Sequence, residues 1–276
     1  MTLSAAMDGA FAIEAQHLRK EYPGRIRALD GVTFGVAVGG LTAVLGPPGA
    51  GKSTVLDILS ARSRPDGGRA WVAGYEVGMA PGTVRRRVGY VGQHSGAGSE
   101  ACAREALLLV GRAQGLSGPR LHGRVEELLV RFGLADVAGT AVHRYPGGLR
   151  RRLDLARVLV HDPAVVLLDE PIAGLDPQDR ADVRGEIGRL AREEGRTVLF
   201  TTRDPADVEH LACELVVLDR GRVVVGSPPG ESAPRIGPAC GGIVRRLVQG
   251  AVGNLAARAP SGTTLSPRGY GSARSG

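Results

Sequence analysis

The stretch that decides the fold reads Gly46-Pro47-Pro48-Gly49-Ala50-Gly51-Lys52-Ser53-Thr54, and it matches the phosphate-binding loop pattern GxxxxGK followed by Ser or Thr. The apolar run Leu41–Leu45 precedes it and a helix is expected over Lys52–Ala61, which is the strand–loop–helix context that the pattern requires. Glycines let backbone N–H groups curl around a phosphate without Cβ clashes, and the helix start adds its positive end. We therefore expect a nucleotide site in which Lys52 reaches the β- and γ-phosphates and the Ser53 hydroxyl ligates Mg²⁺.

Two carboxylates follow a second apolar strand further along the chain. Val165–Leu168 runs directly into Asp169 and Glu170. A buried strand would place Asp169 beside the phosphate loop, where it can hold Mg²⁺ through water, and Glu170 where it can polarise an attacking water. A strand with an acidic end by chance is the minor alternative behind a phosphate loop.

Short apolar runs alternate with longer helical stretches, which indicates an α/β domain with a mostly parallel sheet. Phe11–Phe34 and Arg69–Val77 instead predict a small antiparallel β subdomain. The expected buried strands are Leu41–Leu45, Val88–Val91, Val165–Leu168, Val198–Thr201 and Leu215–Asp219, and the expected helices are Lys52–Ala61, Ala103–Gln114, Leu121–Phe132, Gly148–Val160 and Gln178–Glu193.

Composition divides the 276 residues into a globular body and two ends. We expect a flexible N-terminus over 1–10, one domain over 11–226, and a largely disordered Gly/Pro/Arg-rich tail over 227–276, with one weak helix at Gly242–Ala259. The net charge is +7, and arginines after Glu231 supply most of the excess. Because no basic face with aromatics or a reading helix is evident, nucleic acid is not an expected partner.

The chain has three widely spaced cysteines, Cys102, Cys213 and Cys240, and no CxxC pair. This pattern fits a reducing cytosol better than a disulfide framework or a zinc site. No apolar run approaches the ~18 residues that span a bilayer, so a soluble chain is expected.

The order of motifs resembles that of the ABC ATPases. The phosphate loop is followed by Gln93 after a strand, by a helix start at Gly147-Gly148 with basic residues after it, and then by Asp169-Glu170-Pro171 and Ala173-Gly174-Leu175-Asp176-Pro177. The basic run and the wording of the last two motifs look most like drug-resistance exporters of daunorubicin type. The resemblance covers Glu14 to Val225 and implies a P-loop fold of ABC type with an additional helical subdomain.

Several roles follow from the resemblance alone. It implies that Tyr22 stacks on adenine, that Gly46 to Thr54 hold the phosphates of ATP, and that Gln93 approaches Mg²⁺ and the attacking water and senses a membrane subunit. Gly147 and Gly148 would present N–H groups to the γ-phosphate of ATP bound on the opposite protomer, and Asp176 would lie in the loop joining the protomers. The implied partners are a transmembrane permease and a second ATP-binding subunit, in a homo- or heterodimer, on the inner face of the cell membrane.

Two positions depart from the family pattern. The signature, normally Leu-Ser-Gly-Gly-Gln, reads Tyr145-Pro146-Gly147-Gly148-Leu149, so the Ser hydroxyl that would donate to the γ-phosphate is replaced by Pro146. The usual Thr-Thr-His reads Thr201-Thr202-Arg203. Arg203 keeps a phosphate donor but cannot accept a hydrogen bond, and it is either a useful cation beside phosphate or a surface residue of a degenerate site. His210 is expected on a helix surface.

Three functions stay open from the sequence. The leading one is the ATP-hydrolysing subunit of an ABC exporter for a small, drug-like molecule. The second is an ABC protein that binds ATP and dimerises but hydrolyses slowly beside a competent partner. A non-transport ABC protein acting on DNA or the ribosome is less favoured, because the chain lacks tandem cassettes and long inserted arms.

Overall fold

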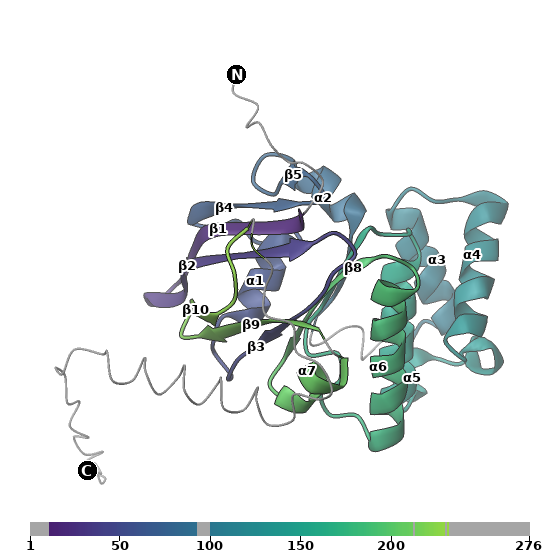
Figure 1. Cartoon of the computed structure of the whole chain (residues 1–276). Coiled ribbons are helices and arrows are strands. Elements are labelled where there is room, and N and C mark those ends of the chain that lie inside the picture. The colour runs from purple at the N-terminus through teal and green to yellow at the C-terminus, as the bar shows by residue number, and fades with distance from the viewer. Residues whose placement is uncertain (1–10, 93–99, 212, 230, 232–276) are drawn as a thin grey trace, which may run out of the picture.

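The computed structural model describes residues 11–92, 100–211, 213–229 and 231. Gln93, the N-terminal residues 1–10 and the expected helix Gly242–Ala259 lie outside the described residues, as does most of the predicted tail. The described chain forms two lobes around a central sheet, a β-rich lobe and a helical lobe (Figure 1). The sequence-based domain boundaries stay a prediction.

The central sheet has the strand order β10-β9-β3-β8-β7-β6. Neighbours from β9 to β6 pair in parallel, and only β10, at one edge, pairs antiparallel. The mostly parallel sheet predicted from the alternating pattern is therefore confirmed. Its strands are β3 (Leu41–Leu45), β6 (Val88–Val91), β7 (Val165–Leu168), β8 (Thr197–Thr202), β9 (Glu214–Asp219) and β10 (Arg222–Val225).

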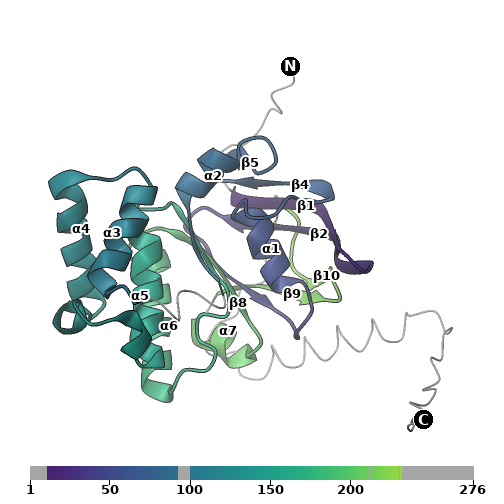
Figure 2. The same cartoon turned by 180° about the vertical axis from the view of Figure 1, so that it is seen from behind.

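A second, antiparallel sheet has the order β2-β1-β4-β5, as Phe11–Phe34 and Arg69–Val77 predicted. Helix α1 (Lys52–Leu59) lies between the two sheets (Figure 2). Val55 and Leu59 of α1 share one core with residues of both sheets, among them Phe34 and Val44. The strands of this second sheet are β1 (Phe11–Tyr22), β2 (Ile26–Ala37), β4 (Gly67–Val72) and β5 (Tyr75–Glu76).

Alternate residues of the central strands face two different cores. In β3, Val44 packs toward α1 and the antiparallel sheet, whereas Ala43 and Leu45 pack toward the helical lobe. A strand buried on both faces is apolar at nearly every position, and the buried Thr42 of β3 donates its hydroxyl to Glu214 at 3.4 Å. This explains why these strands read as continuous apolar runs in the sequence.

The helical lobe covers the other face of the central sheet. The predicted helices that fall on described residues are confirmed, with ends that differ by a few residues. The short helix α2 and the edge strand β10 were not predicted, and α7 was anticipated only by the expectation that His210 lies on a helix surface. The helices are α2 (Pro81–Arg87), α3 (Ala103–Ala113), α4 (Gly118–Arg131), α5 (Gly147–Leu159), α6 (Pro177–Arg192) and α7 (Pro205–Leu211). None of the helices in the described part of the chain is long and apolar enough to cross a membrane.

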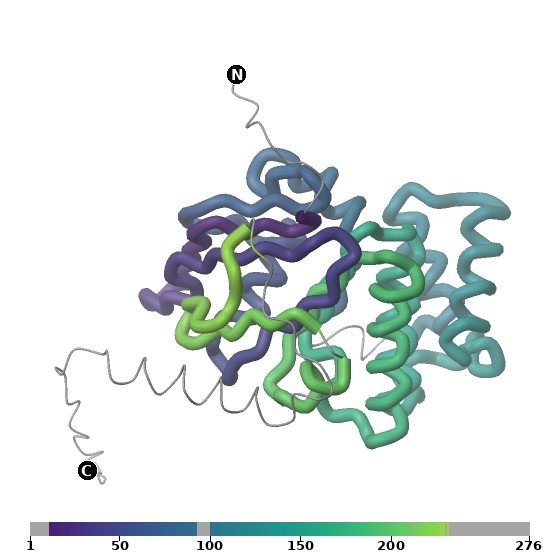
Figure 3. The backbone as a smooth tube through the Cα atoms, viewed as in Figure 1, coloured from purple at the N-terminus to yellow at the C-terminus, as the bar shows by residue number. Residues whose placement is uncertain are grey.

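The end of the described chain returns to its beginning, as the tube in Figure 3 shows. The Asp30 amide donates to the Gly221 carbonyl at 2.8 Å, and the Gly221 amide donates to the Ala50 carbonyl at 3.1 Å. The Gly35 amide also donates to the carbonyl of Ser227, the first residue of the predicted tail. The β9–β10 turn therefore ties the phosphate loop to β2.

Candidate functional site

The phosphate loop joins β3 to α1, and its glycines are needed for close packing. Gly51 has φ of 99°, a left-handed conformation that favours glycine, and a Cβ there would meet the Ala28 carbonyl oxygen at 2.5 Å. A Cβ at Gly46 would meet the Leu218 carbonyl oxygen at 2.4 Å. Larger residues at either position would push the loop away from β2 and β9.

The side chain of Lys52 is buried and points back over the loop. Its ammonium donates to the carbonyls of Gly46 at 2.8 Å and Pro47 at 3.0 Å, and it lies 3.7 Å from Glu170 Oε1. Burial lowers the pKa of Lys52, and the charges of Glu170 and Asp169 oppose that shift, whereas the charge of Arg203 adds to it. The loop thus holds a desolvated cation beside a carboxylate.

A pocket of about 340 Å³ opens beside this lysine. Most of its lining had been predicted, but Ile26, Arg27 and Ala28 of β2 had not, because no motif marks them. Ile26 is largely exposed and offers an apolar wall. The lining comprises Ile26, Arg27, Ala28, Pro48, Gly49, Ala50, Gly51, Lys52, Ser53, Thr54, Glu170 and Arg203.

A single threonine orients both predicted acids. The Thr201 hydroxyl donates to Asp169 Oδ1 at 2.6 Å and accepts from the Glu170 amide at 2.9 Å. All three residues are buried, and Glu170 has φ of 46°, an uncommon conformation for a residue with a side chain and one that clusters at functional sites. Thr201 had no predicted role. The one sequence signal for such a role is its place two residues before Arg203.

Arg203 lies on Glu170. Its Nε donates to Glu170 Oε2 at 2.9 Å, and its Nη2 contacts the same oxygen. The carboxylate is 7% exposed and the Arg203 side chain 47%. Arg203 therefore lies against one of the predicted acids, and Glu170 is placed between two cations, Arg203 and Lys52.

The altered signature forms the start of α5, and its residues Pro146, Gly147 and Gly148 do not line this pocket. Pro146 is the N-cap residue of α5, and within the described structure it makes no side-chain cap hydrogen bond. A Cβ on Gly147 would meet no described atom within 4 Å, whereas a Cβ on Gly148 would collide with the carboxylate of Asp179. Arg152 bridges Asp179 and Asp182 of α6. Gly147 is therefore exposed, and Gly148 is required where α5 packs against α6.

Several predicted residues are not brought into the pocket. Asp176 caps α6, its Oδ1 accepting from the Asp179 amide at 2.9 Å. Tyr22 ends β1 with the Lys20 ammonium 5.8 Å from its ring centroid. Of the described residues predicted for the site, Tyr22, Gly46, Pro47, Pro146, Gly147, Gly148, Asp169 and Asp176 are absent from the pocket lining. His210 is exposed on α7, as predicted.

The donor set near the loop suits Mg²⁺. Ser53 and Asp169 offer a hydroxyl and a carboxylate, and Mg²⁺ is usually bound by one or two carboxylates together with substrate phosphates and water. The hydrogen bond from Thr201 fixes the orientation of the Asp169 carboxylate. These residues fit the predicted ion.

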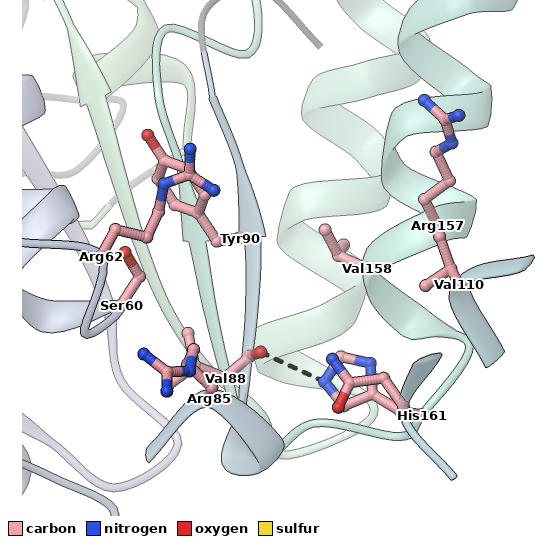
Figure 4. Close-up of a pocket in the computed structure, with 10 residues that line it drawn as sticks. Ser60, Arg62, Arg85, Val88, Tyr90, Val110, Arg157, Val158 and His161 are labelled. Atoms are coloured by element: carbon pink, nitrogen blue, oxygen red, sulfur yellow. Dashed lines mark hydrogen bonds between the residues drawn. The ribbon is translucent and has the colours of Figure 1, made fainter. Parts of the chain in front are cut away.

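A second pocket, of about 330 Å³, lies between the two lobes (Figure 4). The Tyr90 ring of β6 lies beside Arg62, and the Val88 carbonyl is 3.1 Å from His161 Nε2 (Figure 4). The Tyr90 hydroxyl donates to Asp57 at 3.2 Å, and burial, with the Asp57 charge, raises the pKa of Tyr90. Its lining combines apolar and cationic side chains: Ser60, Arg62, Arg85, Val88, Tyr90, Val110, Gln114, Arg157, Val158 and His161.

Sequence comparison assigns the family. The profile described as "ABC transporter" matches residues 29–173. The chain is 43% identical to the daunorubicin resistance ATP-binding protein DrrA2 of Streptomyces coeruleorubidus, over 81% of this chain and 68% of that protein. It is 37% identical to the Nod factor export ATP-binding protein I of Paraburkholderia xenovorans (strain LB400), over 82% of this chain and 74% of that protein. The chain therefore belongs to the ABC transporter family and is one of its ATP-binding, ATP-hydrolysing subunits.

Solved structures agree with this assignment. A structure described as an ATP-binding subunit of an ABC transporter superposes with a TM-score of 0.72 at 25% identity, covering 87% of this chain and 99% of that one. A dimeric, post-hydrolysis structure of the cassette MJ0796 bound to ADP and Pi gives 0.70 at 25% identity, covering 76% and 96%. The predicted P-loop fold of ABC type is confirmed.

Proposed function

We propose that this chain hydrolyses ATP to drive export of a small, drug-like or antibiotic-like molecule through a separate membrane subunit. The observation that carries the proposal is one pocket that brings together the complete phosphate loop, Lys52 and Glu170. Similarity to a daunorubicin resistance protein and to a Nod factor export protein supports the export direction.

The pocket's own residues suggest how hydrolysis proceeds. The loop amides and the Lys52 ammonium hold the phosphates, and Arg203 adds a cation at the same end of the pocket. Water attacks the γ-phosphorus, the bond to the β–γ bridging oxygen breaks, and ADP leaves with the electron pair. Glu170 orients the water and takes one of its protons. Ser53 and Asp169, together with Gln93, are the residues that would hold Mg²⁺, which supplies charge neutralisation at the phosphates.

The signature glycines belong to a different part of this arrangement. Gly147 is exposed at the positive end of α5 and does not line its own chain's described phosphate pocket. An exposed helix start with open space above it suits an anion brought by another molecule. We propose that two ATP-binding subunits pair so that Pro146, Gly147 and Gly148 of one face the γ-phosphate held by the other, with Asp176 near the join.

The inter-lobe pocket is the surface we assign to the membrane subunit. It lies between β6 and α3, the elements that flank Gln93, so a segment seated there would contact both lobes. Arg62, Arg85 and Arg157 surround apolar Val88 and Val158, which favours a short amphipathic segment carrying an acidic side chain. Purification of the tagged chain from its native membranes tests whether a membrane subunit is bound. Recovery of the chain without an integral membrane protein would count against the assignment.

Replacement of Lys52 by Ala tests the nucleotide site. Loss of one charge-assisted contact weakens binding by about 1.5–3 kcal/mol, so we expect at least a tenfold rise (roughly,) in the Kd for Mg-ATP and loss of turnover. Titration calorimetry and phosphate release measure the two effects. Arg120→Ala, at an exposed position of α4, is the control and should behave as the parent. If Lys52→Ala binds Mg-ATP as tightly as the parent, the assigned site is wrong.

A further inference from the structure

Glu170 is engaged by a cation that the family pattern does not place there. Nε and Nη2 of Arg203 both contact one oxygen of Glu170, Oε2. The other oxygen, Oε1, lies 3.7 Å from Nζ of Lys52. A carboxylate oxygen that accepts two N–H groups has little capacity left to accept a hydrogen bond from water. As long as this contact persists, Glu170 is poorly placed to orient or deprotonate a nucleophile.

The Arg203–Glu170 pair stands between two pockets. Both residues line the phosphate pocket and also a smaller pocket of about 120 Å³. The other carboxylates of the smaller pocket are already paired, Asp204 with Arg180 at 3.5 Å and Asp207 with Arg184 at 2.5 Å. On the phosphate side, a γ-phosphate would offer the guanidinium a more highly charged, bidentate partner than Glu170 does.

From this geometry we propose that Arg203 is a γ-phosphate sensor that holds Glu170 and releases it when ATP is bound. Arg203 turns from Oε2 to the γ-phosphate, and Glu170 then becomes available to water. ADP lacks the group that attracts Arg203, so the contact with Glu170 is kept. The half-exposed side chain of Arg203 makes this movement feasible, whereas Glu170 stays buried on its strand. This inference rests on the proposed ATP site.

A double-mutant cycle tests the exchange of partners. The full chain, Arg203→Gln, Glu170→Gln and the double variant are unfolded thermally alone, with Mg-ADP, and with an ATP analogue whose β–γ bridge is an imido group. Without nucleotide and with ADP, the effects of the two single changes should be coupled, by a few degrees of unfolding midpoint. With the analogue the coupling should vanish, because Arg203 no longer touches Glu170.

A matched pair elsewhere in the chain serves as control. Arg131 Nε donates to Glu186 Oε1 at 2.9 Å, and Arg131 Nη2 contacts the same oxygen, between α4 and α6. The Arg131→Gln and Glu186→Gln cycle should give the same coupling in all three conditions. A second readout is affinity: Arg203→Gln should lose about tenfold for the ATP analogue but less than about twofold for ADP. Arg203→Met, which likewise removes the guanidinium donors, provides an alternative variant if the glutamine protein folds poorly.

The outcomes separate the inference from the function beneath it. Coupling that persists with the analogue, or that is absent without nucleotide, would refute the sensor. An equal loss of affinity for the analogue and for ADP would also refute it. If the analogue does not raise the unfolding midpoint of the parent chain at all, the assignment of the ATP site is wrong. The proposed role of Arg203 is then wrong as well.

Discussion

At the scale of single residues, two departures define how this subunit differs from the family pattern. Arg203 replaces a His that could both accept and donate a hydrogen bond. It contacts Glu170, the carboxylate that we propose orients the attacking water. Pro146 stands where the family pattern has a Ser, and proline has no side-chain donor. In the composite site that we propose, each change would remove one directed hydrogen bond, so both favour slow turnover.

Restoring these residues should accelerate hydrolysis. One hydrogen bond directed at a transition state is worth ~2.7–4 kcal/mol, or 10²–10³ in rate, although two such gains need not add. We expect Arg203→His and Pro146→Ser, singly and together, to raise turnover of the purified chain while the Kd for ATP changes only a few-fold. Steady-state phosphate release and calorimetry measure both. If the parent already turns over as fast as the doubly restored chain, the two departures have no catalytic consequence.

The sequence predicts residues well where one local pattern fixes both conformation and chemistry. Gly51 and Lys52 lie in the loop between β3 and α1, as expected, because the pattern between strand and helix leaves few geometries for them. The contact of Arg203 with Glu170 joins β7 to β8 across 33 positions of the chain, and no local pattern encodes a partner at that separation. Thr201 was missed for the same reason, since its role exists only once the two strands are paired.

At the scale of elements, parallel strands buried on both faces were predictable, and short elements at the edges were not. β7 is apolar at every position and β3 at every position except Thr42, because two cores need apolar residues. α2 and β10 are short, and β10 is only partly buried at a sheet edge, so periodicity gives little signal there. Tertiary contacts, such as the Arg222–Asp30 pair and the Asp30–Gly221 hydrogen bond, hold that edge.

The junction between α5 and β6 should make folding sensitive to mild acid. His161 Nε2 lies 3.1 Å from the Val88 carbonyl, and its Nδ1 is buried without a hydrogen-bond partner in the described structure. Burial lowers the pKa of His161 below 6.5; the Val88 carbonyl and the Asp162 charge oppose this shift, and the Arg196 charge adds to it. Below pH 6.5 the unfolded chain therefore binds the proton more readily than the folded chain, and stability falls as the pH falls through that window.

The unfolding midpoint of the parent should accordingly drop between about pH 7.5 and about pH 5.5. His161→Gln keeps a donor for the Val88 carbonyl and removes the titration, so its midpoint should fall less over the same range. His122→Gln, at an exposed position of α4, should show the same pH dependence of the unfolding midpoint as the parent. An identical pH dependence for the parent and His161→Gln would show that the buried imidazole does not contribute.

At the scale of the whole molecule, the proposed pairing divides each ATP site between two chains. The phosphate pocket carries Lys52 and Glu170, whereas Gly147 opens α5 outside the lining of that pocket. Dimeric packing of a related cassette with ADP and Pi fits this division. Under this proposal neither part is sufficient alone, and we expect the active unit to be a pair of chains in which each contributes a different part to each site.

Complementation between two inactive variants tests this division. Lys52→Ala disables the phosphate pocket and leaves the signature intact. Gly147→Asp leaves the phosphate pocket intact and disables the signature. A side chain at this position has open space, and a carboxylate in the first turn of a helix is compatible with folding. The new negative charge would, however, repel a partner's γ-phosphate. Each variant alone should be nearly inactive. In an equal mixture about half of the pairs are mixed and each has one sound site, so turnover should recover to roughly a quarter of the parent value. Light scattering with ATP establishes that mixed pairs form. If they form and turnover stays at the level of the single variants, each chain must complete its own site, and the exposed start of α5 has no part in a partner's hydrolysis.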